Sequence, residues 1–253
     1  MYSRSIFNAS HNLCIVLVAL LVMTGCAQTE YLHEGEQPEN PMARTVRVDL
    51  KDAFFRIAPT CVAVLPTVSV SSTSPALTDF IERSVARYLS QRVPMIIGPN
   101  QRHQITQRLT VDLSDPDGRA RFLKGASCDA FIEPQLMAAS DDYFVVWSNR
   151  SIDLRLRLFQ PRIGGDGEDD NLLWIARHAA SRGGGGFPLD LASLGIGAIK
   201  AGSHQMDYEM NFSIVEDAVR RMMVTLPDTR GGIAFDARPT SAALRMDARA
   251  SVK

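Results

Sequence analysis

Short apolar runs that alternate with helical patterns constrain the fold of this chain more than any other feature. Residues 62–66 form an apolar run of a length typical of strands covered on both faces, and residues 94–98 and 129–137 are expected to form a second and a third strand. Residues 75–92 place apolar side chains at three- and four-residue spacing, which predicts a helix with one buried stripe. Buried strands joined by helical crossovers predict a short parallel sheet of three strands.

Two more helices are expected between the second and third strands. One covers residues 101–109. The other begins at Asp115, a residue type that often caps helices, with Pro116 in its first turn. Gly125 is expected to end this helix, because glycine adopts the left-handed conformation that closes many helices.

The second half of the chain has an antiparallel character. Residues 152–158 alternate apolar and polar side chains, and residues 144–147 precede them across the turn 148–150. Residues 172–180 predict a further strand, and residues 211–226 predict a closing helix. The predicted fold class is therefore α/β, with a short parallel sheet extended by an antiparallel hairpin and closed by a C-terminal helix.

The start of the chain has the pattern of a bacterial export signal. Arg4 is the only charged residue before an unbroken apolar segment, residues 13–23, which is too short to span a bilayer as a helix. Gly25 and then Cys26 follow this segment. The stretch resembles the lipobox of lipoprotein precursors, which are cut before the cysteine and acylated on it.

That resemblance implies lipidation at Cys26, with palmitate among the acyl chains. Several chains anchor a protein to a membrane more stably than one chain does. Ala27 stands where aspartate would favour retention in the inner membrane. We therefore expect an outer-membrane protein, lipid-anchored on the periplasmic face.

Composition divides the rest of the chain. Residues 1–25 are the expected signal peptide, and residues 26–43 are polar and rich in glutamate, which predicts an acidic flexible tether. Residues 44–227 are expected to form a single α/β domain, and residues 228–253 a disordered tail. Without the signal, 26 basic and 28 acidic residues remain, so the charge gives no reason to expect nucleic acid as a partner.

Two cysteines remain once Cys14 in the signal and Cys26 are assigned. Cys61 and Cys128 each stand directly before a predicted parallel strand. If the first and third strands are neighbours, their amino ends lie side by side, within the reach of a disulfide. Disulfides persist in the periplasm, so we predict this bond, with two free buried thiols as the alternative.

The order of the elements resembles the periplasmic lipoproteins of the curli-secretion-channel type and their relatives in exopolysaccharide export. The matching stretches are residues 62–66, 77–89, 125–132, 156–159 and 172–174. The resemblance implies a soluble domain similar to the N-terminal domain of the Tol-Pal β-propeller protein. Curli-type channels also insert long hairpins into the membrane. Here the expected hairpin has a short turn and carries Arg155 and Arg157, so we expect a relative without pore-forming hairpins.

No pattern in the sequence predicts catalysis. His103, His178 and His204 stand alone, and there is no paired spacing of metal ligands or nucleophile elbow. The four glycines at 183–186 lack the Lys-Ser or Lys-Thr pair of a phosphate-binding loop, so a flexible loop is expected there. We therefore predict a protein that is not an enzyme and that has neither cofactor nor metal.

An apolar segment follows these glycines. Phe187, Pro188, Leu189 and Leu191 could form a contact surface, or they could fold back over the sheet edge. We predict a non-enzymatic assembly or secretion accessory factor that self-associates or binds envelope secretion components. The alternative is a monomeric periplasmic binding module for a glycan or a protein.

Overall fold

The computed structural model describes residues 29–40, 43–70, 73–144, 147–161, 171–185 and 208–231. The strands are β1 (Thr29–Leu32), β2 (Arg44–Leu50), β3 (Cys61–Val64), β4 (Val68–Ser69), β5 (Met95–Ile97), β6 (Ala130–Phe144), β7 (Trp147–Gln160) and β8 (Asn171–Gly185). The helices are α2 (Asp52–Ile57), α3 (Pro75–Leu89), α4 (Pro99–Leu109), α5 (Pro116–Ala126) and α7 (Tyr208–Met223).

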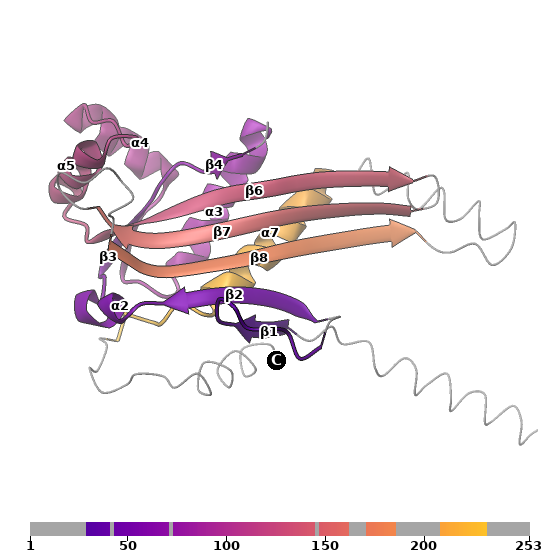
Figure 1. Cartoon of the computed structure of the whole chain (residues 1–253). Helices are drawn as coiled ribbons and strands as arrows, with labels where there is room; N and C mark the ends of the chain where they lie inside the picture. The colour runs from indigo at the N-terminus through magenta and orange to yellow at the C-terminus, as the bar shows by residue number, and fades with distance from the viewer. Residues whose placement is uncertain are drawn as a thin grey trace, which may run out of the picture.

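All the described strands belong to one mixed sheet with the order β1-β2-β8-β7-β6-β3-β5, and β4 pairs with β6. Strands β5, β3 and β6 are parallel, as the sequence predicts, and β6, β7, β8 and β2 are antiparallel. Figure 1 shows β6, β7 and β8 as long strands that leave the end of the sheet where α4 and α5 lie. The fold is α/β.

Local signals explain where the helices begin. The Ser74 side chain accepts a hydrogen bond from the backbone of Leu77 at the start of α3, and Asp115 caps α5 in the same way. The predicted end of α5 is wrong by two residues. Gly125 lies inside the helix, and Ser127 adopts the left-handed conformation at φ 54° instead. At Gly125 the helix packs closely on α4, because a Cβ there would lie 2.6 Å from Cδ1 at the end of the flexible Leu109 side chain.

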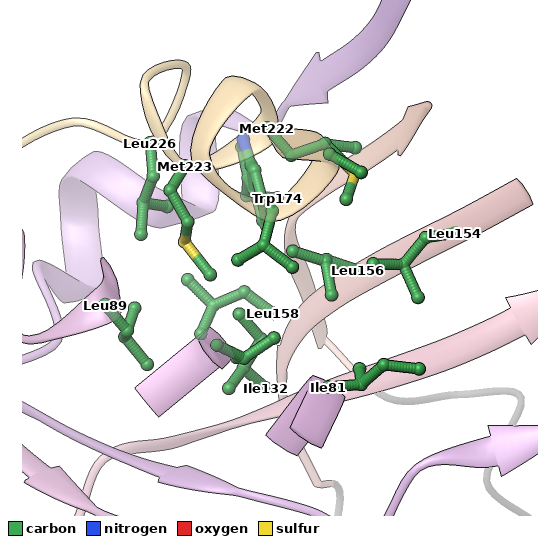
Figure 2. Packing of buried hydrophobic residues seen from close by; sticks show 14 of the residues in the cluster. Ile81, Leu89, Ile132, Leu154, Leu156, Leu158, Trp174, Met222, Met223 and Leu226 are labelled. Atoms are coloured by element: carbon green, nitrogen blue, oxygen red, sulfur yellow. The ribbon is translucent and has the colours of Figure 1, made fainter. Parts of the chain in front are cut away.

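The larger core lies between the sheet and the pair α3 and α7. Trp174 is fully buried at its centre, and Leu156 and Met222 pack beside it (Figure 2). The Trp174 indole N–H donates to Thr225 Oγ1 at 3.1 Å, so its polar atom is satisfied. This face of the sheet is the apolar side of the alternation in β7.

A second core lies on the opposite face, beneath α4 and α5. The rings of Phe122, Phe131 and Phe159 pack in series, with centroids 5.6 and 6.2 Å apart. The sheet is therefore covered on both faces where β3 and β5 lie. Among the described elements, only α3 and α7 cover the long strands farther along, and they cover one face (Figure 1).

The hairpin turn predicted at residues 148–150 is wrong. β6 continues to Phe144 and β7 begins at Trp147, and these two residues are paired. Residues 148–150 lie inside β7, because their backbones pair with β6 on one side and with β8 on the other. Serine and asparagine are typical of turns, but here Ser148 and Asn149 occupy strand positions instead.

The boundaries of the domain differ from those predicted. The expected tether, residues 26–43, contains β1, which pairs in parallel with β2 and buries Leu32. At the other end, Thr229 is buried and its backbone N–H donates to the Arg92 carbonyl at 2.8 Å. The ordered domain therefore begins before residue 44 and extends past residue 227. Residues 1–28 and 232–253 lie outside the described residues.

Candidate functional site

The predicted disulfide partners lie side by side. The Cα atoms of Cys61 and Cys128 are 4.7 Å apart, and the two sulfur atoms form a disulfide. The parallel pairing of β3 with β6, which matches Val62 to Ala130, produces this approach. The strand adjacency that the sequence predicted is therefore confirmed.

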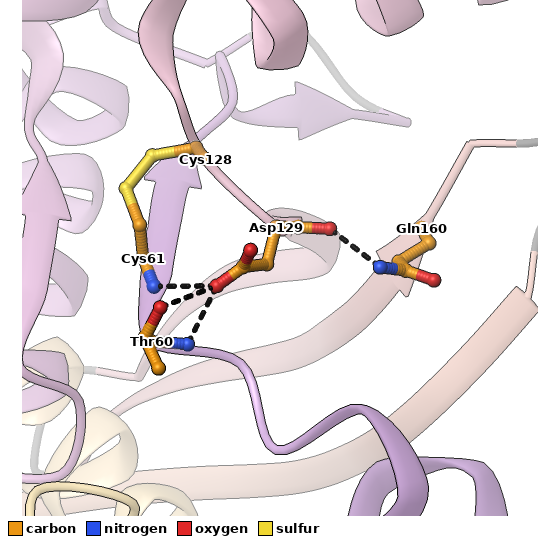
Figure 3. Close-up of a disulfide and its surroundings, with 5 residues drawn as sticks. All are labelled: Thr60, Cys61, Cys128, Asp129 and Gln160. Carbon is orange, nitrogen blue, oxygen red and sulfur yellow. Dashed lines mark hydrogen bonds between the residues drawn. A yellow bond between two sulfur atoms is a disulfide. The ribbon is translucent and has the colours of Figure 1, made fainter.

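Asp129 reinforces the same junction (Figure 3). Its Oδ2 atom accepts three hydrogen bonds, from the Thr60 backbone and hydroxyl at 2.7 and 2.8 Å and from the Cys61 backbone at 3.0 Å. The Gln160 side chain donates to the Asp129 carbonyl at 2.9 Å. The disulfide and the carboxylate thus hold the amino ends of β3 and β6 and the end of β7 together. This arrangement is structural.

Protein groups occupy the carboxyl ends of the parallel strands, where α/β sheets often bind ligands. Arg102 and Glu82 form an ion pair at 2.8 Å with only 12% and 11% of each side chain exposed. Arg102 also donates to the Val64 carbonyl at 2.6 Å, and Glu82 accepts from the Thr67 backbone at 2.8 Å. These contacts join α3 and α4 to the end of β3.

The opposite edge of the domain carries a cluster of charges between β2 and α7. Asp217 accepts hydrogen bonds from Arg220 at 2.7 Å and Arg221 at 2.8 Å, and Arg44 approaches it at 3.5 Å. Burial of Asp217 opposes its ionisation, but the bonds from Arg221 and Arg220 outweigh burial and lower the pKa of this carboxyl. Arg221 also donates to the hydroxyl of Thr29 in β1.

His178 lies beside this cluster on β8 with 1% of its surface exposed. Its Nδ1 atom lies 2.7 Å from the Thr45 carbonyl, which only accepts, so the ring proton is on Nδ1. Burial lowers the pKa of the imidazole, and the nearby charges of Arg221 and Arg44 act in the same direction. The neutral ring therefore keeps a lone pair on Nε2, and this atom has no partner among the described residues.

A small cavity of about 40 Å³ lies beside His178 and Asp217. Its lining includes Arg44, His178, Ser181, Arg182, Ile214 and Asp217. This site was not predicted from the sequence, because its residues come from β2, β8 and α7. The alternation along β8 was the one available signal, since it places His178 and Arg182 on the face of Trp174.

The face of the long strands that no described helix covers carries a row of arginines. Arg155, Arg177 and Arg47 are paired in register across β7, β8 and β2. Arg177 forms a hydrogen-bonded ion pair with Asp153. Like charges directly opposite each other on a sheet are destabilising, so this arginine row costs stability in the isolated domain.

Other predicted site residues fall in different places. The His103 ring forms a hydrogen bond with the Gln107 side chain at 2.9 Å, and both residues are exposed on α4. Residues 183–185, expected in a flexible loop, form the end of β8 and pair with residues 147–149. Cys26, His204, Gly186 and the segment with Phe187, Pro188, Leu189 and Leu191 lie outside the described residues. No group of three metal-ligating side chains occurs within the described part of the chain.

Comparisons with known proteins give distant matches. No protein family model and no curated protein matches the chain. A PelC dodecamer from Paraburkholderia phytofirmans is similar, with a TM-score of 0.38 and 13% identity over 70% of this chain and 94% of that one. Lipoprotein GNA1162 from Neisseria meningitidis has a TM-score of 0.37 and 16% identity over 58% of this chain and 98% of that one. Matches this distant do not indicate the function of this chain.

Across the residues that the structure describes, no helix is both long enough and apolar enough to cross a membrane.

Proposed function

We propose that this chain is a lipid-anchored protein of the outer membrane that acts from the periplasmic face. Its role is that of a non-enzymatic assembly or secretion accessory factor, and it works through self-association. The observation that carries the proposal is the row of Arg155, Arg177 and Arg47 on the sheet face that no described helix covers.

The lipobox-like start supports the anchoring. Acylation of Cys26 would fix the chain to the membrane three residues before Thr29, where β1 begins. Three residues reach at most about 11 Å when fully extended. The folded domain would therefore lie against the membrane, in place of the longer flexible connection that the sequence suggested.

The arginine row supports self-association. Asp153 forms an ion pair with Arg177, the middle arginine of the row, and partly offsets the repulsion among the three positive side chains. Contact with further acidic groups relieves more of this repulsion. A second copy offers such groups, because Glu34 is exposed in the acidic turn between β1 and β2. Contact between the arginine row of one copy and the acidic turn of the next is the head-to-tail kind that builds rings when it closes.

Mass measurement tests the self-association. The full-length protein, extracted from membranes in detergent, is expected to form a species larger than one copy, and added salt is expected to reduce it. Arg155→Glu should shift the population to monomer, whereas Arg83→Glu, at an exposed position of α3, should leave it unchanged. A monomer at every concentration would contradict self-association and favour a monomeric binding module.

Fractionation tests the anchoring. Cys26→Ser removes the acyl acceptor, so the variant should remain unprocessed or be mislocalised. Recovery of Cys26→Ser in outer membranes after an alkaline wash would contradict the anchored protein that we propose.

A further inference from the structure

The cavity beside His178 has the chemistry of a site for a phosphate group. Arg44 and Arg182 line it, and guanidinium groups bind phosphate oxygens through paired hydrogen bonds. Both side chains reach solvent: 44% of the Arg44 side chain is exposed, and Arg182 is exposed as well. A ligand can therefore approach the two arginines from outside.

The charges of these two arginines are only partly satisfied within the described residues. Asp217 is the carboxylate of the cavity, and its short hydrogen bonds go to Arg220 and Arg221. Arg44 stands farther from it, at 3.5 Å. The described partner of Arg182 is the hydroxyl of Ser213, which is neutral. The cavity thus keeps positive charge for an anion.

His178 adds a second, independent feature. Its Nε2 atom is buried and lacks a partner among the described residues, and the neutral ring offers a lone pair there. A buried polar atom without a hydrogen bond is costly, so a ligand that donates a hydrogen bond to it gains affinity. The preferred ligand therefore combines a phosphate group with a hydroxyl group.

The position of the cavity identifies the source of such a ligand. Arg44 is paired in register with Thr29, and Arg221 donates to the Thr29 hydroxyl. Thr29 follows Cys26 by three residues, so acylation of Cys26 would bring this edge of the domain to the lipid headgroups. Anionic lipids attract basic groups near the membrane surface, so they would attract Arg44 and Arg182 at this position.

We propose that this cavity binds the headgroup of an anionic phospholipid that carries hydroxyl groups, with phosphatidylglycerol as the representative. Arg44 and Arg182 donate to the phosphodiester oxygens, and a headgroup hydroxyl donates to His178 Nε2. The assignment rests on the proposed anchoring at Cys26. Its consequence is that the domain is oriented on the membrane by a specific lipid contact as well as tethered to it.

The full-length protein in lipid nanodiscs provides the test. Discs of phosphatidylcholine alone are compared with discs that also contain phosphatidylglycerol or phosphatidylserine, and the midpoint of thermal unfolding is measured. A ligand that binds only the folded state raises the midpoint, here by about 4 °C in phosphatidylglycerol. Phosphatidylserine should raise it less, because it lacks the glycerol hydroxyls and its remaining donor is an ammonium group, which Arg44 and Arg182 repel.

The variants separate the parts of the site. Arg44→Gln combined with Arg182→Gln should abolish the response to both anionic lipids, whereas Arg83→Gln should retain it. His178→Asn keeps a donor for the Thr45 carbonyl and removes Nε2, so it should lower the phosphatidylglycerol response to the phosphatidylserine level. Near-ultraviolet circular dichroism verifies that each variant is folded.

Three results would overturn the assignment: equal midpoints in all discs, an equal response to both anionic lipids, or a full response in the double arginine variant. Inorganic phosphate and glycerol phosphate are added separately to phosphatidylcholine discs. If either raises the midpoint as much as phosphatidylglycerol does, the ligand is soluble and the membrane source is wrong. Failure of the anchoring itself would appear in the fractionation of Cys26→Ser, which does not depend on headgroup chemistry.

Discussion

Cys61 and Cys128 are 67 positions apart in the sequence, yet their Cα atoms lie 4.7 Å apart at the amino ends of two parallel strands. The bond closes a long loop that contains α3, β5, α4 and α5. Long closed loops restrict the unfolded chain strongly, so the chain-entropy account assigns them a large stabilisation.

We expect the double variant Cys61→Ala, Cys128→Ala to lose about 2–4 kcal/mol of unfolding free energy. Denaturant unfolding under oxidising conditions measures the loss. A reducing agent should lower the stability of the wild type and leave the double variant unchanged. An equal response of both proteins to the reducing agent would contradict a stabilising disulfide.

Gly118 in α5 is expected to tolerate no side chain. A Cβ at this position would lie 1.8 Å from the carbonyl oxygen of Asp112, and a backbone atom cannot move aside as a flexible side chain can. Gly118→Ala should therefore cost about 3 kcal/mol or more. Gly231→Ala is the matched control, because a Cβ there meets no atom within 4 Å. Similar thermal midpoints for the two variants would refute the steric argument.

The parallel half of the fold could be predicted from the sequence because its signals are local. Ser74 and Asp115 cap helices, and the apolar runs that follow Cys61 and Cys128 are short and buried on both faces. The disulfide then followed from one assumption about strand order.

The antiparallel half was harder to predict, because its pairing is decided by distant partners. Residues 148–150 have the sequence of a turn, but they pair with β8 as part of a strand. Residues 29–32 have the sequence of a tether, but they pair with β2. The cavity was not predictable either. Arg44 and His178 reach it from separate strands, and neither has a neighbour in sequence that indicates a site.

The buried indole of Trp174 depends on one hydroxyl group. Its N–H donates to Thr225 Oγ1 at 3.1 Å, and that hydroxyl donates to the Met222 carbonyl at 2.7 Å. Thr225→Val keeps the shape of the side chain and removes both bonds, so we expect a loss of about 1–3 kcal/mol. Thr225→Ser retains the hydroxyl and should lose less. Equal unfolding free energies for the two variants would show that the hydroxyl contributes nothing.

The buried His178 should make stability depend on pH. Burial lowers the pKa of its imidazole below the ordinary value of 6.5, so the unfolded chain binds a proton more readily than the folded protein does. Above pH 6.5 the imidazole is mainly neutral in both states, so this loss of stability is absent. As the pH falls from 6.5 toward the lower folded pKa, stability should fall by at most about 1.4 kcal/mol per pH unit.

Unfolding free energies measured across this pH range test the effect in wild type and in two asparagine variants. His178→Asn cannot take up the proton, so its curve should lack the part of the slope that His178 contributes. His103→Asn changes an exposed residue of α4, so its curve should keep that part of the slope. If the His178→Asn and wild-type curves have the same slope, another group causes the pH dependence. Because the imidazole also lines the cavity, a bound headgroup hydroxyl that donates to Nε2 should stabilise the neutral ring and extend the stable range to lower pH.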